Sequence, residues 1–274
     1  MRRLRTGIIG GGAIGSYILD ALMENKVENC EAIVLSGRSE KSRGKDKVLS
    51  YGLSWVTDPV EMLNYDLDVI VEAASHEALE QYGLDILKTG VDFVPVSLGA
   101  LVDGDLLRRL REAAAEGGST LHIPSGGIGG LDALQAAVIA GVDRVTMTSR
   151  KPPRAWKNIP YVEAMGIDLD NMTEKTVLYE GPARDCVKEF PQNINIAADL
   201  SLAGIGFDET IIRILADPTV VLNTHEIEWE GTAGKAHIVF ENLPIPVNPK
   251  TTYQASLSIL AALKRLRSPY HIGT

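Results

Sequence analysis

The chain has 274 residues, of which 45% are hydrophobic and 23% charged, and its formal net charge is −9 at pH 7. This length fits one large or two ordinary domains, and the composition is close to the soluble globular average. The negative charge argues against nucleic acid and anionic membrane surfaces as partners. Cys30 and Cys186 are far apart and in no metal-binding spacing, so we expect no metal site, no disulfide framework and a reducing compartment. No stretch approaches ~18 uninterrupted apolar residues, so we expect no membrane span.

The first twenty residues predict a strand, a tight turn and a helix. Gly10, Gly12 and Gly15 fall in the spacing G-x-G-x-x-G. The first glycine permits the turn, the second lets the backbone approach a pyrophosphate, and the third lets helix and strand pack closely. A second strand, "EAIVLSGRS", follows at the expected distance, so the segment predicts a dinucleotide site. The expected cofactor contacts in this turn are Gly10, Gly12, Ala13, Ile14 and Gly15.

The end of that second strand bears on the choice of cofactor. NAD-specific sites usually carry an acid there, which holds the ribose 2′-OH. This chain instead has Ser36, Gly37, Arg38 and Ser39. Because this segment contains no acid, no like charge would repel a 2′-phosphate. Arg38 and Ser39 offer groups that can bind one. We therefore expect NADP to bind and NAD to be tolerated; the alternative is that Arg38 is a solvated loop residue.

Strands and helices alternate up to residue 123, which is typical of a doubly wound parallel sheet. "LDVIVEAAS" and "DFVPVSLGAL" are expected to be buried strands, each followed by a helix. Ligands bind at the carboxyl ends of the strands in such a sheet. The prediction is an α/β fold with a Rossmann-type dinucleotide-binding domain over residues 1–123. The residues expected to line the nicotinamide half of the cofactor are Ala73, Ala74, Ser97, Gly99 and Ala100.

The second half of the chain changes character. "PSGGIGGLDAL" predicts a glycine loop leading into a helix, and glycine there lets the backbone approach a ligand closely. Short alternating segments follow, and "GTAG" predicts a hairpin turn between the last two of them. We expect an α+β substrate domain over residues 124–249, built on a mostly antiparallel sheet. Residues 250–274 are expected to form a helix that packs back on the first domain.

Two asparagines stand at the start of an otherwise small and aliphatic run, "FPQNINIAADLSLAG". Asparagine is ordinary at a helix N-cap, where its side chain accepts a hydrogen bond from a free backbone N–H. That explains one of Asn193 and Asn195 but not both. Residues two apart on a helix point ~200° from each other, so the second asparagine is expected to face something polar.

Strand parity separates the histidines of the second half. In "VVLNTHEIEW", His225 shares a face with Asn223 and Ile227, while Glu226 and Glu228 lie on the opposite, acidic face. His225 is therefore expected to point inward or into a cleft, whereas His237 is expected to be exposed. On parity alone, a functional histidine and a satisfied core histidine remain equally open.

The order of motifs resembles the L-aspartate dehydrogenase family. The matching stretches are "GIIGGGAIG", "IVEAAS", "SLGAL", "PSGGIGGLDAL", "RKPPRAW", "GPARDCVKEFPQNINIAADLSLAG", "ADPTVVLNTHEIEWEG" and "NPKTTYQASLSILAAL". They cover nearly the whole chain, and the central and C-terminal blocks are the specific ones. The resemblance implies a cytoplasmic homodimer that oxidises a small-molecule substrate, L-aspartate, with NAD or NADP. The product, iminoaspartate, would hydrolyse to oxaloacetate and ammonia or feed quinolinate and NAD biosynthesis.

The resemblance also assigns residues. The family's catalytic histidine falls on His225, and its cofactor-side asparagine falls in the Asn193/Asn195 pair. We prefer Asn195 for the cofactor and place Asn193 at the helix cap, on the substrate side. The family often has alanine where this chain has Gly127, which leaves that cofactor contact to the backbone. The substrate's two carboxylates need cations; the candidates are Lys151, Arg154 and Lys250, with Arg150 and Lys157 on the same predicted loop.

Two other kinds of protein remain open at this point. The nearest is another enzyme of similar architecture, such as a homoserine dehydrogenase or a dihydrodipicolinate reductase. A different class is a non-catalytic dinucleotide sensor, which would need no base in its cleft. His225 argues against the sensor.

Overall fold

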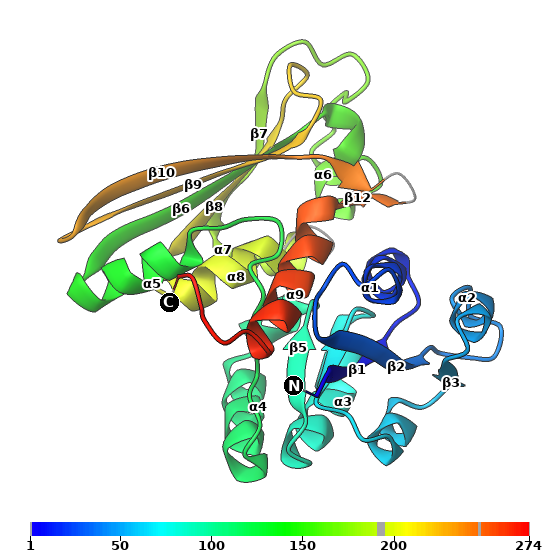
Figure 1. Cartoon of the computed structure of the whole chain (residues 1–274). Coiled ribbons are helices and arrows are strands. Elements are labelled where there is room, and N and C mark those ends of the chain that lie inside the picture. The colour runs from blue at the N-terminus through cyan, green and yellow to red at the C-terminus, as the bar shows by residue number, and fades with distance from the viewer. Residues whose placement is uncertain (1, 191–194, 246–247, 274) are drawn as a thin grey trace. The chain divides into compact units, whose positions relative to one another are not determined.

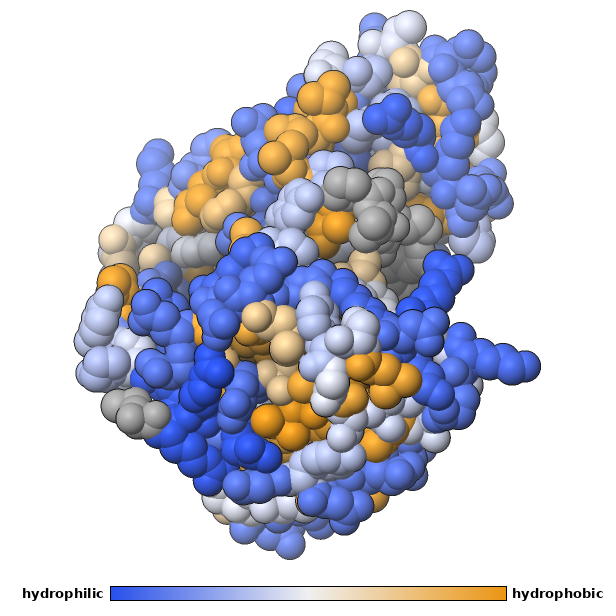
Figure 2. All heavy atoms as spheres, turned by 45° about the vertical axis from the view of Figure 1, so that its right-hand side comes forward, coloured by the Kyte–Doolittle hydropathy of each residue, from blue (hydrophilic) through white to orange (hydrophobic). Residues whose placement is uncertain are grey.

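The computed structural model describes residues 2–190, 195–245 and 248–273, and the side chains of 248–250 are not described. The chain divides into two compact units (Figure 1). The first contains residues 1–124 and 255–272, and the second contains residues 125–254 with the last two residues. No helix among the described residues is long and apolar enough to cross a membrane. Hydrophilic side chains cover most of the face drawn in Figure 2.

A five-stranded parallel sheet forms the centre of the first unit (Figure 1). Its strand order is β3-β2-β1-β4-β5, so the chain order reverses between β1 and β4. The strands β1, β2 and β4 are rich in Ile, Val and Leu because both faces of a parallel sheet are covered. The strands are β1 (Leu4–Ile9), β2 (Cys30–Ser36), β3 (Ser54–Val56), β4 (Val69–Glu72) and β5 (Asp92–Pro95).

The helices of this unit begin where the sequence supplies caps. Ser75 caps α3 (His76–Lys88) by accepting the N–H of Ala78, and Asp103 caps α4 (Gly104–Gly117) by accepting the N–H of Asp105. The remaining elements are α1 (Ala13–Met23), α2 (Lys45–Ser50), η1 (Pro59–Asn64), η2 (Leu98–Val102) and α9 (Tyr253–Leu266).

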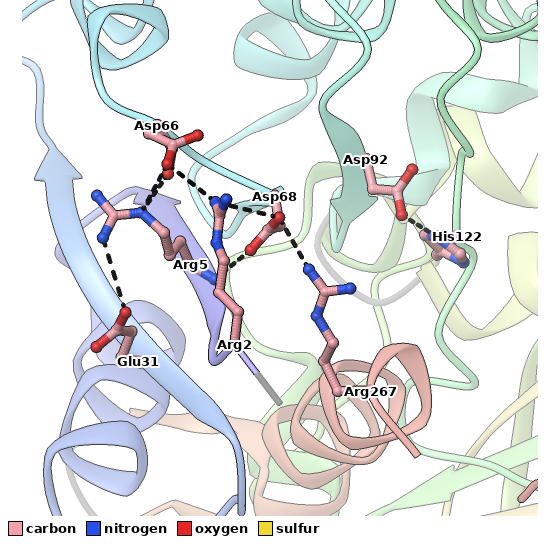
Figure 3. Close-up of polar contacts among 8 residues, drawn as sticks. All are labelled: Arg2, Arg5, Glu31, Asp66, Asp68, Asp92, His122 and Arg267. Atoms are coloured by element: carbon pink, nitrogen blue, oxygen red, sulfur yellow. Dashed lines mark hydrogen bonds and ion pairs between the residues drawn. The ribbon is translucent and has the colours of Figure 1, made fainter. Parts of the chain in front are cut away.

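The C-terminal helix α9 belongs to the core of the first unit. Its buried side chains Ile259, Leu260 and Leu263 join one apolar cluster with Ile8 of β1 and Ile18 of α1. A polar network adds to this packing at the amino-terminal edge of the sheet (Figure 3).

In that network, Asp68 accepts the backbone N–H of Arg5 at 2.8 Å and pairs with Arg267, just beyond α9, at 2.8 Å (Figure 3). Asp68 thus links β1, β4 and the chain beyond α9. Asp92, at the start of β5, pairs with His122 at 3.2 Å.

The second unit is built on a five-stranded sheet of order β10-β9-β6-β8-β7. Within the described residues, β6 and β8 run parallel and the other neighbouring strands run antiparallel. The predicted fold class, a doubly wound parallel sheet followed by a mostly antiparallel one, is confirmed. The strands are β6 (Val142–Lys151), β7 (Thr176–Pro182), β8 (Thr210–Ala216), β9 (Asn223–Gly231) and β10 (Gly234–Asn242).

Helices cover one face of this second sheet. Gly130, at the start of α5, lies against Ile238 of β10, and Gly204, after α8, lies against Val145 of β6. Both contacts fall on the face that carries Ile227, which is fully buried. The remaining elements are α5 (Leu131–Ala140), η3 (Pro153–Trp156), α6 (Pro160–Ala164), α7 (Ala183–Glu189), α8 (Asn195–Ala203), β11 (Pro244–Ile245) and β12 (Asn248–Thr252).

Two expected elements differ from the structure. The alternation of strands and helices up to residue 123 predicts a last strand in "STLHIPSGG", but within this stretch only Leu121 forms a bridge, to Phe93. The carboxylate of Asp92 accepts the N–H of Thr120 at 2.8 Å, and the chain turns away into the glycine loop after Pro124. Lys151 was expected on a loop, but it ends β6 and is paired with Ala216 of β8.

Candidate functional site

The turn after β1 has the geometry that a dinucleotide requires. Gly10 has a φ of +103°, which favours glycine. A Cβ on Gly15 would lie 1.9 Å from the carbonyl oxygen of Gly10, so helix α1 can approach β1 only with glycine there. A Cβ on Gly12 would meet no atom within 4 Å, which leaves open space at the N-terminus of α1. A pyrophosphate fits this space, with the helix N–H groups as donors.

At the end of β2, Arg38 and Ser39 are exposed, while Ser36 is buried. The conformation of this loop is set by Gly37, whose N–H bonds to the Val56 carbonyl at 3.1 Å. A Cβ on Gly37 would lie 2.4 Å from the indole of Trp55. Arg38 and Ser39, the predicted 2′-phosphate contacts, are thus exposed just after the end of β2.

The ends of β1, β4 and β5 lie side by side at the point where the strand order reverses. Ala73 donates its N–H to Ile9 of β1, and a Cβ on Gly10 would lie 2.5 Å from the carbonyl oxygen of Ala73. The predicted cofactor-lining residues Ala73, Ala74, Ser97, Gly99 and Ala100 all follow β4 or β5 directly. Such a reversal is where ligands bind in open α/β sheets.

Sequence reasoning missed an acid at this edge. Glu72, the last residue of β4, is completely buried, and burial raises the pKa of its carboxyl despite hydrogen bonds that favour the ionised form. An acid at the end of a run of Val and Ile was the available signal.

A second polar group lies on the helix-covered face of the second sheet. Ser149 of β6 pairs directly with His225 of β9, so the two side chains share a face. Lys151 and Asn223 lie two residues farther along the same strands and therefore on this face as well. All four residues are buried. Val145, Met147 and Ile227 continue this face as buried apolar side chains, so the polar group lies toward one end of it.

His225 is 2% exposed, and its Nδ1 atom has no partner among the described residues. Burial, reinforced by the positive charge of Lys151, lowers the pKa of His225 to about 3. Strand parity predicts the direction of this side chain but not its desolvation. The imidazole is consequently neutral at ordinary pH, and in the free chain it is a weak base.

The other basic candidates whose side chains are described are not gathered with Lys151. Arg150 points to the opposite face of β6, where it pairs with Glu226 and, at 3.6 Å, with Asp217. Arg154 and Lys157 are exposed, and Lys157 pairs with Asp170. Lys250 belongs to β12, and its side chain lies outside the described residues. Lys151 is thus the buried cation beside His225, and its Nζ lies 5.1 Å from the ring centre of Trp156.

The glycine loop after Pro124 reaches the same polar end. The carbonyl of Gly127 accepts a hydrogen bond of 2.6 Å from Asn242, the residue that pairs with Asn223 across β10 and β9. A Cβ on Gly127 would lie 3.0 Å from Ile196, next to Asn195 at the start of α8. Gly127, predicted to contact the cofactor, is therefore close to the residue that follows Asn195, the other predicted contact. Asn193 lies outside the described residues.

One further acid in this unit was missed. Asp199 of α8 is 1% exposed, and neither carboxyl oxygen has a partner among the described residues. Burial raises the pKa of Asp199 well above its ordinary value. A Cβ on Gly126 would lie 2.6 Å from Oδ2, so this position beside the carboxyl admits only glycine. "AADLSLAG" carries no periodic signal that separates such an acid from a surface one.

A glycine turn at the switch point of a parallel sheet, and a buried lysine and histidine in a second domain, define an NAD(P)-dependent oxidoreductase. Residues 10–124 match the model of the NAD-binding domain of homoserine dehydrogenase. Residues 132–266 match the model of the C-terminal domain of aspartate dehydrogenase.

Relatives over the full length are more specific. The chain is 42% identical over 271 residues to an L-aspartate dehydrogenase of Methanosarcina barkeri, covering 99% of this chain and 100% of that one. It is 37% identical to one from Ralstonia pickettii, covering 95% and 96%. The crystal structure of aspartate dehydrogenase from Thermotoga maritima matches with a TM-score of 0.77 at 28% identity, covering 99% and 100%. The chain belongs to the aspartate dehydrogenase family, which confirms the resemblance found in the sequence.

Proposed function

We propose that the chain oxidises L-aspartate to iminoaspartate with NADP or NAD as hydride acceptor. Iminoaspartate would then hydrolyse to oxaloacetate and ammonia, or feed quinolinate and NAD biosynthesis. The observation that carries this proposal is the buried Lys151 beside the neutral imidazole of His225, whose Nδ1 atom has no partner among the described residues. A cation and a base are the two groups that an amino acid with carboxylates and a protonated amine requires.

His225 is the base in this proposal. Aspartate arrives with an ammonium group, which must lose a proton before its Cα–H bond can release hydride. The imidazole would take that proton, and the freed nitrogen lone pair would form the C=N bond as the Cα–H bond breaks and hydride departs. Bound NAD(P) would supply the hydride acceptor. Once it has released the first proton to solvent, His225 can accept one from the water that attacks the imine.

Lys151 supplies a charge for a substrate carboxylate. A bound carboxylate offsets the positive charge that Lys151 presents to His225, and so raises the pKa of the imidazole in the complex. Substrate binding would in this way strengthen the base that the reaction needs. Arg154, Lys250 and Asn193 remain candidates for the second carboxylate, and Gly127 and Asn195 for the cofactor.

Reduced-cofactor absorbance with three substrates tests the proposal. We expect NADPH or NADH to form with L-aspartate, and no comparable rate with L-homoserine. L-Alanine should lose ~10- to 100-fold in kcat/KM, since it lacks the distal carboxylate and with it one hydrogen bond between charged groups. Equal kcat/KM for alanine and aspartate would contradict a dicarboxylic substrate. Dinucleotide binding without turnover of any substrate would favour a sensor.

Arg38 tests the choice of cofactor. We expect Arg38→Ala to weaken NADP by ~1–3 kcal/mol more than NAD, because a charge-assisted contact to the 2′-phosphate is lost. Fluorescence titration of both cofactors measures the two dissociation constants. Arg111→Ala, which removes an exposed arginine of α4, is the control and should leave both unchanged. Equal losses for NADP and NAD would remove Arg38 from the 2′-phosphate site.

We also propose that the enzyme is a cytoplasmic homodimer. Family membership supports the dimer, and two free, buried cysteines are in keeping with a reducing compartment. Light scattering after size exclusion would reveal a monomer if the dimer assignment is wrong.

A further inference from the structure

Glu72 accepts more hydrogen bonds than a core carboxylate needs for its own burial. Its Oε1 atom accepts the backbone N–H groups of Ala74 at 2.7 Å and Ser75 at 2.9 Å, together with the Ser97 hydroxyl at 2.9 Å. Its Oε2 atom accepts the backbone N–H groups of Ser97 at 3.1 Å and Val96 at 3.3 Å. One side chain therefore holds the segment that follows β4 and the segment that follows β5.

These two segments form the carboxyl-terminal edge of the sheet beside the glycine turn. Glu72 pairs with Ile9 of β1 on one side and with Pro95 of β5 on the other. The backbone of Ala73 and Ala74 lies against Gly10, the first glycine of the turn. The carboxylate thus sits behind the backbone at the reversal in strand order, where the fold places its ligand.

We propose that Glu72 is a positioning residue for the cofactor: its carboxylate fixes the backbone after β4 and β5 in the arrangement that receives the nicotinamide half of the dinucleotide. The proposal rests on the dinucleotide-binding first unit and not on aspartate as the substrate. Glu72 acts through the backbone, since its own side chain is completely buried.

The chemistry of the carboxylate makes the role specific. A carboxylate has only acceptors, and here it meets five donors. In Glu72→Gln, the amide NH₂ has to face either the N–H groups of Ala74 and Ser75 or those of Val96 and Ser97, because both oxygen positions accept from backbone donors. The hydrogen bonds on that side would be lost, and the backbone there would shift. Glu72→Asp keeps the charge but withdraws it by one methylene, so it cannot reach both segments.

Binding of two ligands to the intact chain tests the proposal. NAD⁺ carries the nicotinamide, whereas ADP-ribose has the same adenosine, pyrophosphate and second ribose without it. Calorimetric titration of each ligand gives a ratio of dissociation constants. We expect Glu72→Gln to weaken NAD⁺ about tenfold more than ADP-ribose, the scale of one lost hydrogen bond to a charged group. Glu72→Asp should shift the ratio in the same direction, and it decides the matter if the glutamine variant does not fold.

Asp68→Asn is the matched control. Asp68 also joins neighbouring strands by accepting a backbone N–H, but at the amino-terminal edge of the sheet (Figure 3). We expect this variant to lower the unfolding temperature without changing the ratio. Equal weakening of NAD⁺ and ADP-ribose in the Glu72 variants, or unchanged binding of both, would overturn the proposal and leave Glu72 as a structural residue. Failure of the unaltered chain to bind NAD⁺ would instead refute the dinucleotide site itself.

Discussion

His225→Ala should lower kcat for L-aspartate oxidation by ~10²–10⁴, the usual loss when a general base is removed. Cofactor affinity should change little, because the glycine turn and the strand ends that are proposed to hold the dinucleotide belong to the other unit. His225→Asn retains a polar group without a titrating nitrogen and should be nearly as impaired. Steady-state oxidation by the variants, with cofactor binding measured separately, gives both quantities.

The pH profile distinguishes a base from a core histidine. In the free chain the pKa of His225 is lowered to about 3, so its titration should not appear in kcat/KM near neutrality. In the substrate complex the carboxylates raise that pKa, and an acid limb should appear in kcat and vanish in His225→Asn. His237→Ala, on the exposed part of β10, is the control. A His225→Ala enzyme with near-normal kcat and an unaltered profile would show that another residue is the base.

The stability advantage of Asp199→Asn over the unaltered protein should grow as the pH rises. Burial in the folded state raises the pKa of Asp199 above its unfolded value of ~4. At a pH between these two pKa values, the unfolded chain has lost a proton that the folded chain keeps. Below pH ~4 the carboxyl is protonated in both states, so the free energy of unfolding is not lowered by its burial as a charge. It falls by about 1.4 kcal/mol per pH unit above that, until the folded pKa is reached. Asparagine removes this loss because its amide is neutral throughout.

Denaturant unfolding of both proteins from pH 4 to pH 8 measures the effect. The two curves should nearly coincide at pH 4 and diverge upward in favour of Asp199→Asn. Asp208→Asn is the control from the same unit, because Asp208 is exposed and Arg184 lowers the pKa of its carboxyl. That variant should show a small difference of opposite sign. Parallel curves for Asp199→Asn would mean that the carboxyl is ionised and compensated in the folded protein.

The elements that the sequence predicted best are those whose signals are local. The glycine spacing at Gly10 and Gly15 has local causes, since Gly10 has a positive φ in the turn and a Cβ on Gly15 would meet the carbonyl oxygen of Gly10. The inward direction of His225 follows from alternation along one strand. Short β3, by contrast, has three residues and no alternation long enough to detect, because its pairing with β2 and not its own propensity defines it.

The rest of the candidate site depends on contacts between distant parts of the chain. Lys151 lies beside His225 only because β6 and β9 pair with Ser149 opposite His225, a register that no short pattern encodes. Glu72 and Asp199 look alike in sequence, as single acids in apolar surroundings. One meets five donors and the other meets none among the described residues. That difference arises from tertiary packing alone.

The contact between Gly37 and Trp55 limits how cofactor preference can be redesigned. The usual route toward NAD introduces an acid at the end of the second strand. At Gly37 that route is closed, because the first carbon of any side chain would overlap the indole at 2.4 Å. Replacing Trp55 as well would open the space but remove a ring that packs against the apolar core of the unit. Libraries aimed at cofactor selectivity should therefore vary Arg38 and Ser39 and leave Gly37 and Trp55 as they are.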